Sequence, residues 1–173
     1  AGHLPHIAKY LLDEGCSLPA VTGFPSTTGP AYLPFLTGCL PGTCNVPGIR
    51  WFDKTKFDAG YSFDRYRSYV GFESFCMAND MWPHIKTIFE LVPNSYTIFN
   101  PISRGAKGAR NVTSISRIWY WYYAHLTDHW KFADEGAIKK LRATVDRRPE
   151  FVFAVFPGID EYAHMLSPRH ERV

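Results

Sequence analysis

The chain of 173 residues contains no apolar run of about 18 residues, the length at which a helix can cross a bilayer. The sequence therefore predicts no membrane-spanning segment. An excess of one charge sign is also lacking, because 19 Lys and Arg stand against 16 Asp and Glu, a formal net charge of +3. This mild positive balance suits an anionic substrate but falls far short of the basic surface typical of nucleic-acid-binding proteins. We expect no nucleic-acid partner.

Cysteine is scarce and is not spaced as in a structural metal site. The chain has four cysteines, Cys16, Cys39, Cys44 and Cys76, and only Cys39 and Cys44 lie close together in sequence. Because no second close pair follows, the spacing excludes a zinc ribbon. Cys39 and Cys44 could bridge a loop in an oxidising compartment, or all four could stay free thiols, since a chain of this length can stabilise a core without disulfides. The sequence leaves the compartment open.

The pattern along the chain is that of an α/β fold. Apolar residues make up 46% and charged residues 20% of the sequence, as in ordinary globular domains. Helical periodicity alternates with short apolar runs, which predicts a sheet with crossover connections. We expect helices over 4–14, 32–36, 80–92 and 133–145, the last with Ile138, Leu141 and Val145 inward, and strands over 17–24, 96–99 and 151–156.

Aromatic residues, 16% of the chain, are frequent between residues 51 and 130. This region is a candidate insertion or pocket region, and six of its aromatic side chains could wall a substrate pocket or pack a small core. They are Tyr61, Phe63, Tyr66, Tyr69, Phe72 and Phe75. The basic loop 103–110 could approach a phosphate or be solvated. His125 and His129 have the spacing of a metal-binding pair on a helix, although packing at the edge of a core explains them as well.

Three hydroxyl residues, Ser26, Thr27 and Thr28, lie between an apolar run and Gly29-Pro30. Proline is favoured in the first turn of a helix, so a hydroxyl placed here would face the positive end of the helix dipole. This position suits a side chain that attacks or holds an anion such as phosphate. The same pattern is also that of a plain helix N-cap, and the pattern alone does not separate the two.

A longer stretch of sequence carries a resemblance. Phe24-Pro25-Ser26-Thr27-Thr28-Gly29-Pro30, followed by Thr37-Gly38 and later by Trp51-Phe52-Asp53, resembles the type I phosphodiesterase/nucleotide pyrophosphatase family. That family belongs to the alkaline phosphatase superfamily of two-zinc phosphate-ester hydrolases. Its Phe-Pro-x-x-Thr threonine is both nucleophile and zinc ligand, and the resemblance assigns these roles to Thr28.

A second element of the resemblance lies near the other end of the chain. The β-prone run 151–156 precedes Asp160 and His164, which is similar to the family's strand followed by Asp-x-x-x-His. In the family both residues bind one zinc ion. A carboxylate and an imidazole at the carboxyl end of a buried strand can converge on one ion, whereas the same spacing in isolation is typical of a surface helix. The resemblance thus implies Thr28, Asp160 and His164 as metal ligands in a two-zinc site.

The resemblance also implies a fold. It predicts an alkaline-phosphatase-like three-layer sandwich with a mostly parallel central sheet, of which residues 1–173 form one α/β domain, the N-terminal part of a larger catalytic domain. The reason is that the family's other ligands find no match here: an aspartate on a first strand, an Asp-His pair and one more histidine. Two positions also depart from the family, with Ala31 in place of an asparagine and Cys44-Asn45 in place of His-Gly.

The implied function is metal-dependent hydrolysis of a small-molecule phosphate ester or nucleotide-like substrate through Thr28. Two alternatives stay open. One is a non-catalytic phosphate-ester-binding relative, favoured by Ala31 and Cys44-Asn45, and the other is a phosphotransferase or mutase on the same fold. The sequence does not decide between monoester and diester substrates, nor does it give the oligomeric state.

Overall fold

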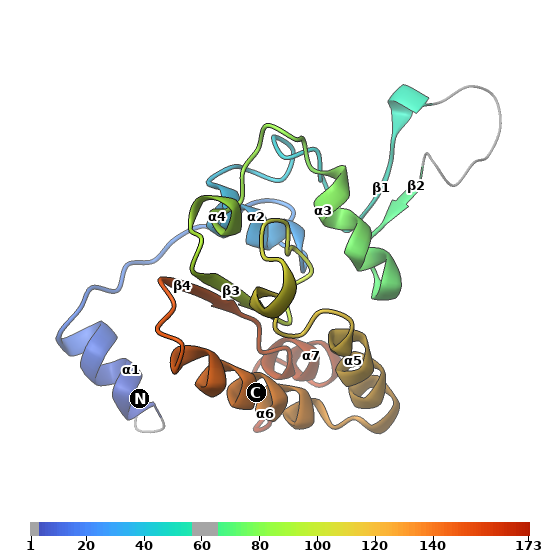
Figure 1. Cartoon of the computed structure of the whole chain (residues 1–173). Coiled ribbons are helices and arrows are strands. Elements are labelled where there is room, and N and C mark those ends of the chain that lie inside the picture. Colours follow the sequence, from blue (N-terminus) through green and yellow to red (C-terminus); the bar gives the residue numbers. More distant parts are fainter. Residues whose placement is uncertain (1–3, 57–65) are drawn as a thin grey trace.

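The structure is a computed structural model that describes residues 4–56 and 66–173 (Figure 1). Its α-helices are α1 (Pro5–Ile7), α2 (Leu33–Thr37), α3 (Met77–Asp80), α4 (Ile88–Leu91), α5 (Ser116–Thr127), α6 (Trp130–Val145) and α7 (Gly158–Met165). Its strands are β1 (Arg50–Phe52), β2 (Tyr66–Ser68), β3 (Ser95–Ile98) and β4 (Phe151–Ala154). A π-helical segment, Ala8–Asp13, continues α1, and short 3-10 helices span Pro30–Tyr32, Lys54–Lys56, Gly71–Cys76 and Gly108–Arg110. None of the helices in this part of the chain combines the length and apolar character needed to cross a bilayer.

The strands β3 and β4 form a parallel pair, as the predicted strands at 96–99 and 151–156 require. Ser95 lies opposite Phe151 and Ile98 opposite Ala154. Parallel neighbours need a long crossover, and here the crossover contains α5 and α6. The strands β1 and β2 form a separate antiparallel pair. Helices and small sheets are therefore mixed, consistent with an α/β fold.

The predicted strand over residues 17–24 is wrong. This segment is irregular and runs between α1 and α2 without joining either sheet (Figure 1). Its apolar side chains are exposed, with 80% of Leu18, 100% of Val21 and 91% of Phe24 accessible to solvent. A strand needs a neighbour to pair its backbone groups, and the described residues provide no backbone hydrogen bond to this segment.

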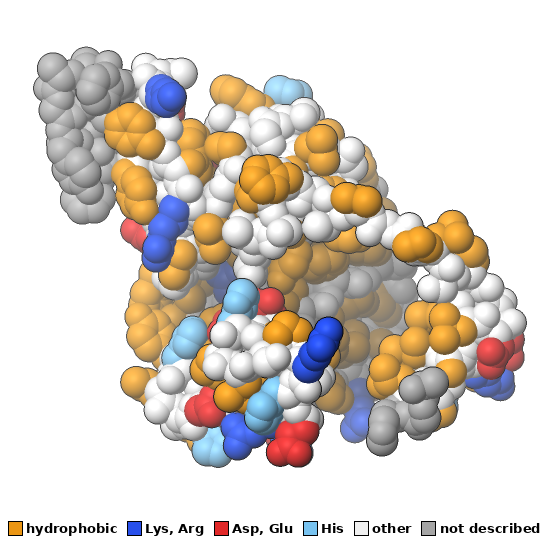
Figure 2. Space-filling view, turned by 180° about the vertical axis from the view of Figure 1, so that it is seen from behind, with side chains coloured by type: hydrophobic (Ala, Val, Ile, Leu, Met, Phe, Trp, Pro, Cys, Tyr) orange, Lys and Arg blue, Asp and Glu red, His pale blue; other side chains and the backbone are white. Residues whose placement is uncertain are grey.

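The predicted N-terminal helix is present as α1 and its π-helical continuation, which ends before Gly15. Its apolar side chains, however, are not buried: Leu4, Ile7 and Leu11 are each about half exposed (Figure 2). The amphipathic pattern correctly predicted the helix, while burial of its apolar face did not follow.

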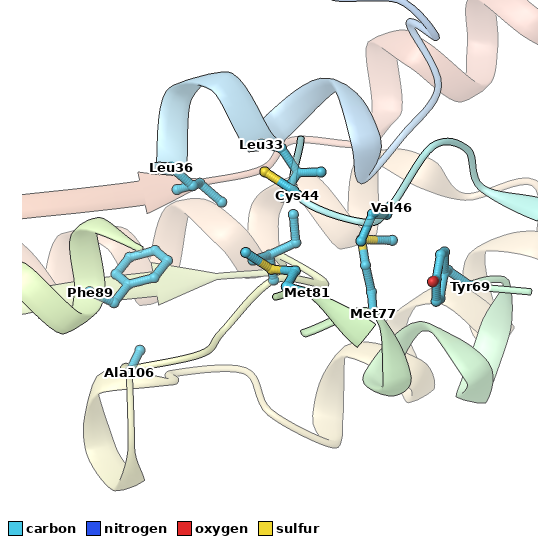
Figure 3. Close-up of a cluster of buried hydrophobic side chains, with 10 residues drawn as sticks. Leu33, Leu36, Cys44, Val46, Tyr69, Met77, Met81, Phe89 and Ala106 are labelled. Carbon is cyan, nitrogen blue, oxygen red and sulfur yellow. The ribbon is translucent and has the colours of Figure 1, made fainter. Parts of the chain in front are cut away.

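The larger of two clusters of buried hydrophobic residues packs against α2, the helix predicted at 32–36 (Figure 3). Leu33 and Leu36 point from α2 into a cluster that also receives side chains from α3, α4 and the loops that follow α2, β2, α3 and β3. Burying side chains of this size stabilises the fold by roughly 1.5–3 kcal/mol each. The other members of the cluster are Cys44, Val46, Tyr69, Met77, Met81, Phe89, Ile102 and Ala106.

The helix α6 confirms the prediction for 133–145 but turns a different face inward. Its buried residues include Ala133 and Ala137, which share one face, whereas Ile138 and Val145 are 40% and 56% exposed. Only Leu141 of the three residues predicted to face inward packs against the core. Small side chains at 133 and 137 let α6 approach its neighbours closely. The face of α6 that is buried is therefore the one with small residues and not the one with the larger apolar side chains.

The helix predicted over 80–92 is wrong except for its last turn. It begins only after Thr87, because Thr87 and Glu90 form a reciprocal capping box in which Glu90 Oε2 accepts the Thr87 N–H at 2.9 Å. Arg104 occupies the carbonyl groups before this point, donating to Met81 O at 3.2 Å and to Ile85 O. Carbonyl groups that a longer helix would have used internally are thus bonded by a guanidinium.

The same network shows that the basic loop 103–110 turns its arginines inward. Arg104 Nε lies 3.2 Å from Glu90 Oε2 and Arg110 Nη2 donates to Gly105 O at 2.6 Å. Burial alone would raise the pKa of Glu90, but the Thr87 N–H and the charges of Arg104 and Lys86 together lower it. Both arginines of this loop are thus bonded within the protein, whereas its Lys107 is exposed.

Thr97, in the middle of β3, gives a testable consequence. Its hydroxyl is fully buried and has no hydrogen-bond partner in the described part of the molecule. Thr97→Val keeps the shape and removes this unsatisfied group, so we expect the free energy of unfolding to rise by about 1 kcal/mol in chemical denaturation. The matched control is Thr113→Val, which deletes the acceptor of the buried Phe99 N–H at 2.8 Å and should lower stability by about 1–3 kcal/mol. Equal losses in both variants would contradict the assignment.

Candidate functional site

The loop that carries Thr28 is anchored at Gly29. Gly29 has φ +92° and ψ −71°, and a side chain at this position would meet Met77 Cε at 2.4 Å. The backbone then forms the 3-10 helix Pro30–Tyr32 and continues into α2. Thr28 therefore precedes a helix, as the sequence predicted, and its residue is solvent-exposed.

A cavity of about 520 Å³ lies beside this loop, and Thr28 is part of its lining. Segments far apart in sequence build it: the Thr28 loop, the region 69–77, helix α5, and the chain that leaves β3 and β4. Its walls are mainly apolar and aromatic, as is typical of small-molecule sites. The main apolar contributors are Tyr32, Tyr69, Met77, Phe99, Trp121 and Val155.

Glu161 of α7 and His125 of α5 also line this cavity. Burial raises the pKa of the Glu161 carboxyl, and the nearby charges of His125 and His164 oppose that rise. Of the two alternatives for His125 and His129, the helical metal-binding pair does not form, because α5 ends at Thr127 and His129 precedes the next helix. His125 instead packs edge-on against Trp130 at 4.6 Å between ring centroids.

Arg117 is the buried cation of the cavity. It lies near the start of α5, is 5% exposed, and donates from Nη2 to Ser74 Oγ at 2.7 Å. Its guanidinium also lies over the ring of Phe75, 4.8 Å from the centroid. Burial lowers its pKa to about 10, so the group remains charged at neutral pH.

Asp160 and His164 lie one turn apart on α7. Asp160 Oδ1 is 3.5 Å from His164 Nε2, and their side chains are 59% and 75% exposed. Neither lines the cavity, although Glu161 between them does. Burial, with a smaller contribution from the charge of Asp160, raises the pKa of the cavity residue Tyr32 to about 12. Asp160 is therefore within electrostatic range of the cavity wall.

The donors of this pair are those that zinc prefers, a carboxylate oxygen and an imidazole nitrogen. A zinc site needs at least three protein ligands, and residues 4–56 and 66–173 contain no cluster of three His, Cys, Asp or Glu side chains that could hold a metal ion. Thr28 lines the cavity, whereas Asp160 and His164 lie outside its lining. The described residues therefore do not complete a metal centre.

The two positions that depart from the resembled family have structural contacts. Cys44 is a buried core residue with a free thiol whose pKa burial raises, and Asn45 Nδ2 donates to Asp80 O at 2.9 Å. All four cysteines are free. Neither Cys44 nor Asn45 lines the cavity, and Ala31 does not line it either.

The aromatic residues of the region 51–130 have divided outcomes. Tyr69 is buried and lines the cavity, whereas Tyr66, Phe72 and Phe75 are at least partly exposed and do not line it. Tyr61 and Phe63 lie outside the described residues. Sequence reasoning missed the polar cavity residues Ser74, Arg117 and Glu161, because no local motif surrounds them and only tertiary contacts place them at one site.

Comparison with known proteins supports the family. The family model described as type I phosphodiesterase / nucleotide pyrophosphatase matches residues 1–173, which is the whole sequence. Comparisons with curated proteins and with solved structures gave no significant match.

Gly29 gives a test of how the Thr28 loop is held. Gly29→Ala places a side chain in a strained backbone region against Met77, so we expect a loss of about 2 kcal/mol of unfolding free energy and displacement of the loop. Gly38→Ala is the matched control, because Gly38 also has positive φ, +71°, yet has no atom within 4 Å of the added carbon. It should cost about 1 kcal/mol. Thermal and urea unfolding measure both, and equal costs would contradict the packing argument.

Proposed function

Because the chain belongs to the type I phosphodiesterase / nucleotide pyrophosphatase family, we propose that it hydrolyses phosphate esters with Thr28 as the nucleophile. The family consists of hydrolases that act on phosphate esters and nucleotides, and its members are typically metal-dependent. The observation that carries the assignment to Thr28 is its position: an exposed hydroxyl on a constrained loop at the edge of a cavity large enough for a small molecule.

The proposed reaction proceeds in two displacements. The Thr28 Oγ forms a bond to phosphorus while the bond from phosphorus to the leaving alcohol breaks. Solvent accepts the proton of the Thr28 hydroxyl and donates a proton to the leaving oxygen. Water then attacks phosphorus, breaks the bond to Oγ and restores the hydroxyl. The neighbouring Gly29 has no side chain, and this lets the backbone next to Thr28 pack directly against Met77.

We also propose Asp160 and His164 as two ligands of a zinc ion. Their separation of 3.5 Å suits two donors of one ion, and their place on the helix that follows β4 agrees with the family pattern. Further ligands of this ion would have to come from outside the described residues. The same holds for the other ligands of a second zinc ion bound by Thr28.

The substrate is proposed to be a small phosphate ester that occupies the cavity beside Thr28. Most of the cavity lining comes from the region 51–130, including Tyr69, Phe99 and Trp121, which supports the proposal that this region forms the substrate pocket. The apolar and aromatic walls suit an ester arm with an apolar or planar body.

The nucleophile is tested by Thr28→Ala in the protein expressed from its complete reading frame. We expect hydrolysis of chromogenic phosphodiesters and monoesters to fall by at least about 10³-fold, because the bond-forming oxygen is removed. Ser26→Ala is the matched control, since Ser26 is an exposed hydroxyl in the same loop and should leave activity unchanged. Full activity in Thr28→Ala would overturn the proposal. Zinc binding without any turnover in the wild type would instead indicate a non-catalytic relative.

The metal ligands are tested by Asp160→Asn. This change removes a charged donor, so we expect zinc affinity, measured by competition with a chromogenic chelator, to fall at least about tenfold. Asp128→Asn is the control, because Asp128 is an exposed carboxylate whose partner is Arg172 at 3.4 Å. The same zinc affinity in both variants would exclude Asp160 as a ligand.

A further inference from the structure

Arg117 is a buried charge without a countercharge. Among the described residues no carboxylate lies within ion-pair distance of it, and its side-chain contacts are one neutral hydroxyl, that of Ser74, and the face of the Phe75 ring. A guanidinium carries five N–H donors in a planar fork. The hydrogen bond to Ser74 uses one of them. Most of its hydrogen-bonding capacity is therefore unused.

Such an arrangement is costly unless something else pairs with the charge. Burying a cation without a partner costs several kcal/mol, and an apolar side chain of similar volume would avoid that cost. Arg117 is 5% exposed and its pKa, about 10, keeps it charged at neutral pH. Core packing alone does not explain a charged residue at this position.

The position of Arg117 indicates where the missing partner would come from. Arg117 lines the same cavity as Thr28, so a molecule in the cavity can reach its unused N–H groups. The carboxylate in the lining, Glu161, is associated with His125 and not with Arg117. The remaining walls are mainly apolar, which leaves Arg117 as the group that a second negative charge would meet.

We infer that Arg117 binds an anionic group, a carboxylate or a phosphate, on the arm of the ligand that fills the cavity beside Thr28. With regard to substrate class this inference rests on the proposed function. It selects phosphate esters whose arm carries a second negative charge in addition to the phosphoryl group attacked at Thr28. Arginine suits this task because its fork pairs with the two oxygens of either group.

The experiment compares three esters that share the reacting phosphate and differ only in the arm. They are phenyl phosphate, 4-carboxyphenyl phosphate and 1,4-phenylene bisphosphate. Affinities are measured by calorimetry on the Thr28→Ala protein, with and without added zinc, so that neither turnover nor catalytic competence enters the result. We expect the charged arms to bind at least about tenfold more tightly than phenyl phosphate. Whichever charged arm binds more tightly identifies the anion.

Introducing Arg117→Met should abolish this preference, and Arg117→Lys should retain part of it. The matched control is Arg172→Met, which removes an exposed positive charge outside the cavity and should leave the preference intact. An unchanged preference in Arg117→Met would overturn the inference, whatever the activity of Thr28 proves to be. Loss of activity in Thr28→Ala tests the proposed function separately.

Thermal unfolding without ligand distinguishes a ligand-binding role from a structural one. If Arg117 serves a ligand, Arg117→Met should unfold at the same temperature as the wild type or higher, because an unpaired buried charge is removed. A melting temperature lowered by several degrees, with no loss of ligand preference, would assign Arg117 to the scaffold and overturn the inference. If Arg117→Met does not fold, the Arg117→Lys affinities decide, since full preference with a shorter, non-planar cation would contradict pairing through the guanidinium fork.

Discussion

The parallel pairing of β3 with β4 is the constraint on which the candidate site depends. Parallel strands place their carboxyl ends at one edge, and the chain leaves β3 at Phe99 and β4 at Val155, both of which line the cavity. The crossover between the strands carries α5, with Arg117 and His125, along the same cavity, and α7 follows β4 directly. Ligands of open α/β sheets gather at this edge for the same geometric reason.

Two arginines show how the fold separates structural from ligand-facing charge. Arg104 is fully engaged: it bonds Glu90 and three backbone carbonyls, and so fixes the start of α4. Arg117 is more deeply buried yet bonds one hydroxyl, on Ser74. Since a buried charge is stable only when it is paired, the contrast between the two separates a residue that holds the scaffold together from one whose partner is a ligand.

The helix α7 joins two chemical environments within one turn. Glu161 faces the cavity, while Asp160 and His164 on either side of it are exposed to solvent and lie 3.5 Å apart. In the proposed function the outer pair binds a metal ion and the cavity holds the organic part of the ester. The Thr28 loop, whose position depends on Gly29 packing against Met77, would present the reacting oxygen at the cavity.

The sequence by itself determined the family, the strands β3 and β4, the helices α2 and α6, and the place of Thr28 in a loop just before a helix. These features depend on local patterns and on a contiguous motif. It failed where distant contacts decide. Residues 17–24 have apolar strand character but no backbone hydrogen bond among the described residues, and Arg104 bonds the carbonyl groups of residues 81, 82 and 85, so the helix predicted over 80–92 begins only after Thr87. Arg117 and Glu161 join the site only through tertiary structure. No short-range signal marks them, since burial and a shared cavity arise only when α5 and α7 pack around the ends of β3 and β4.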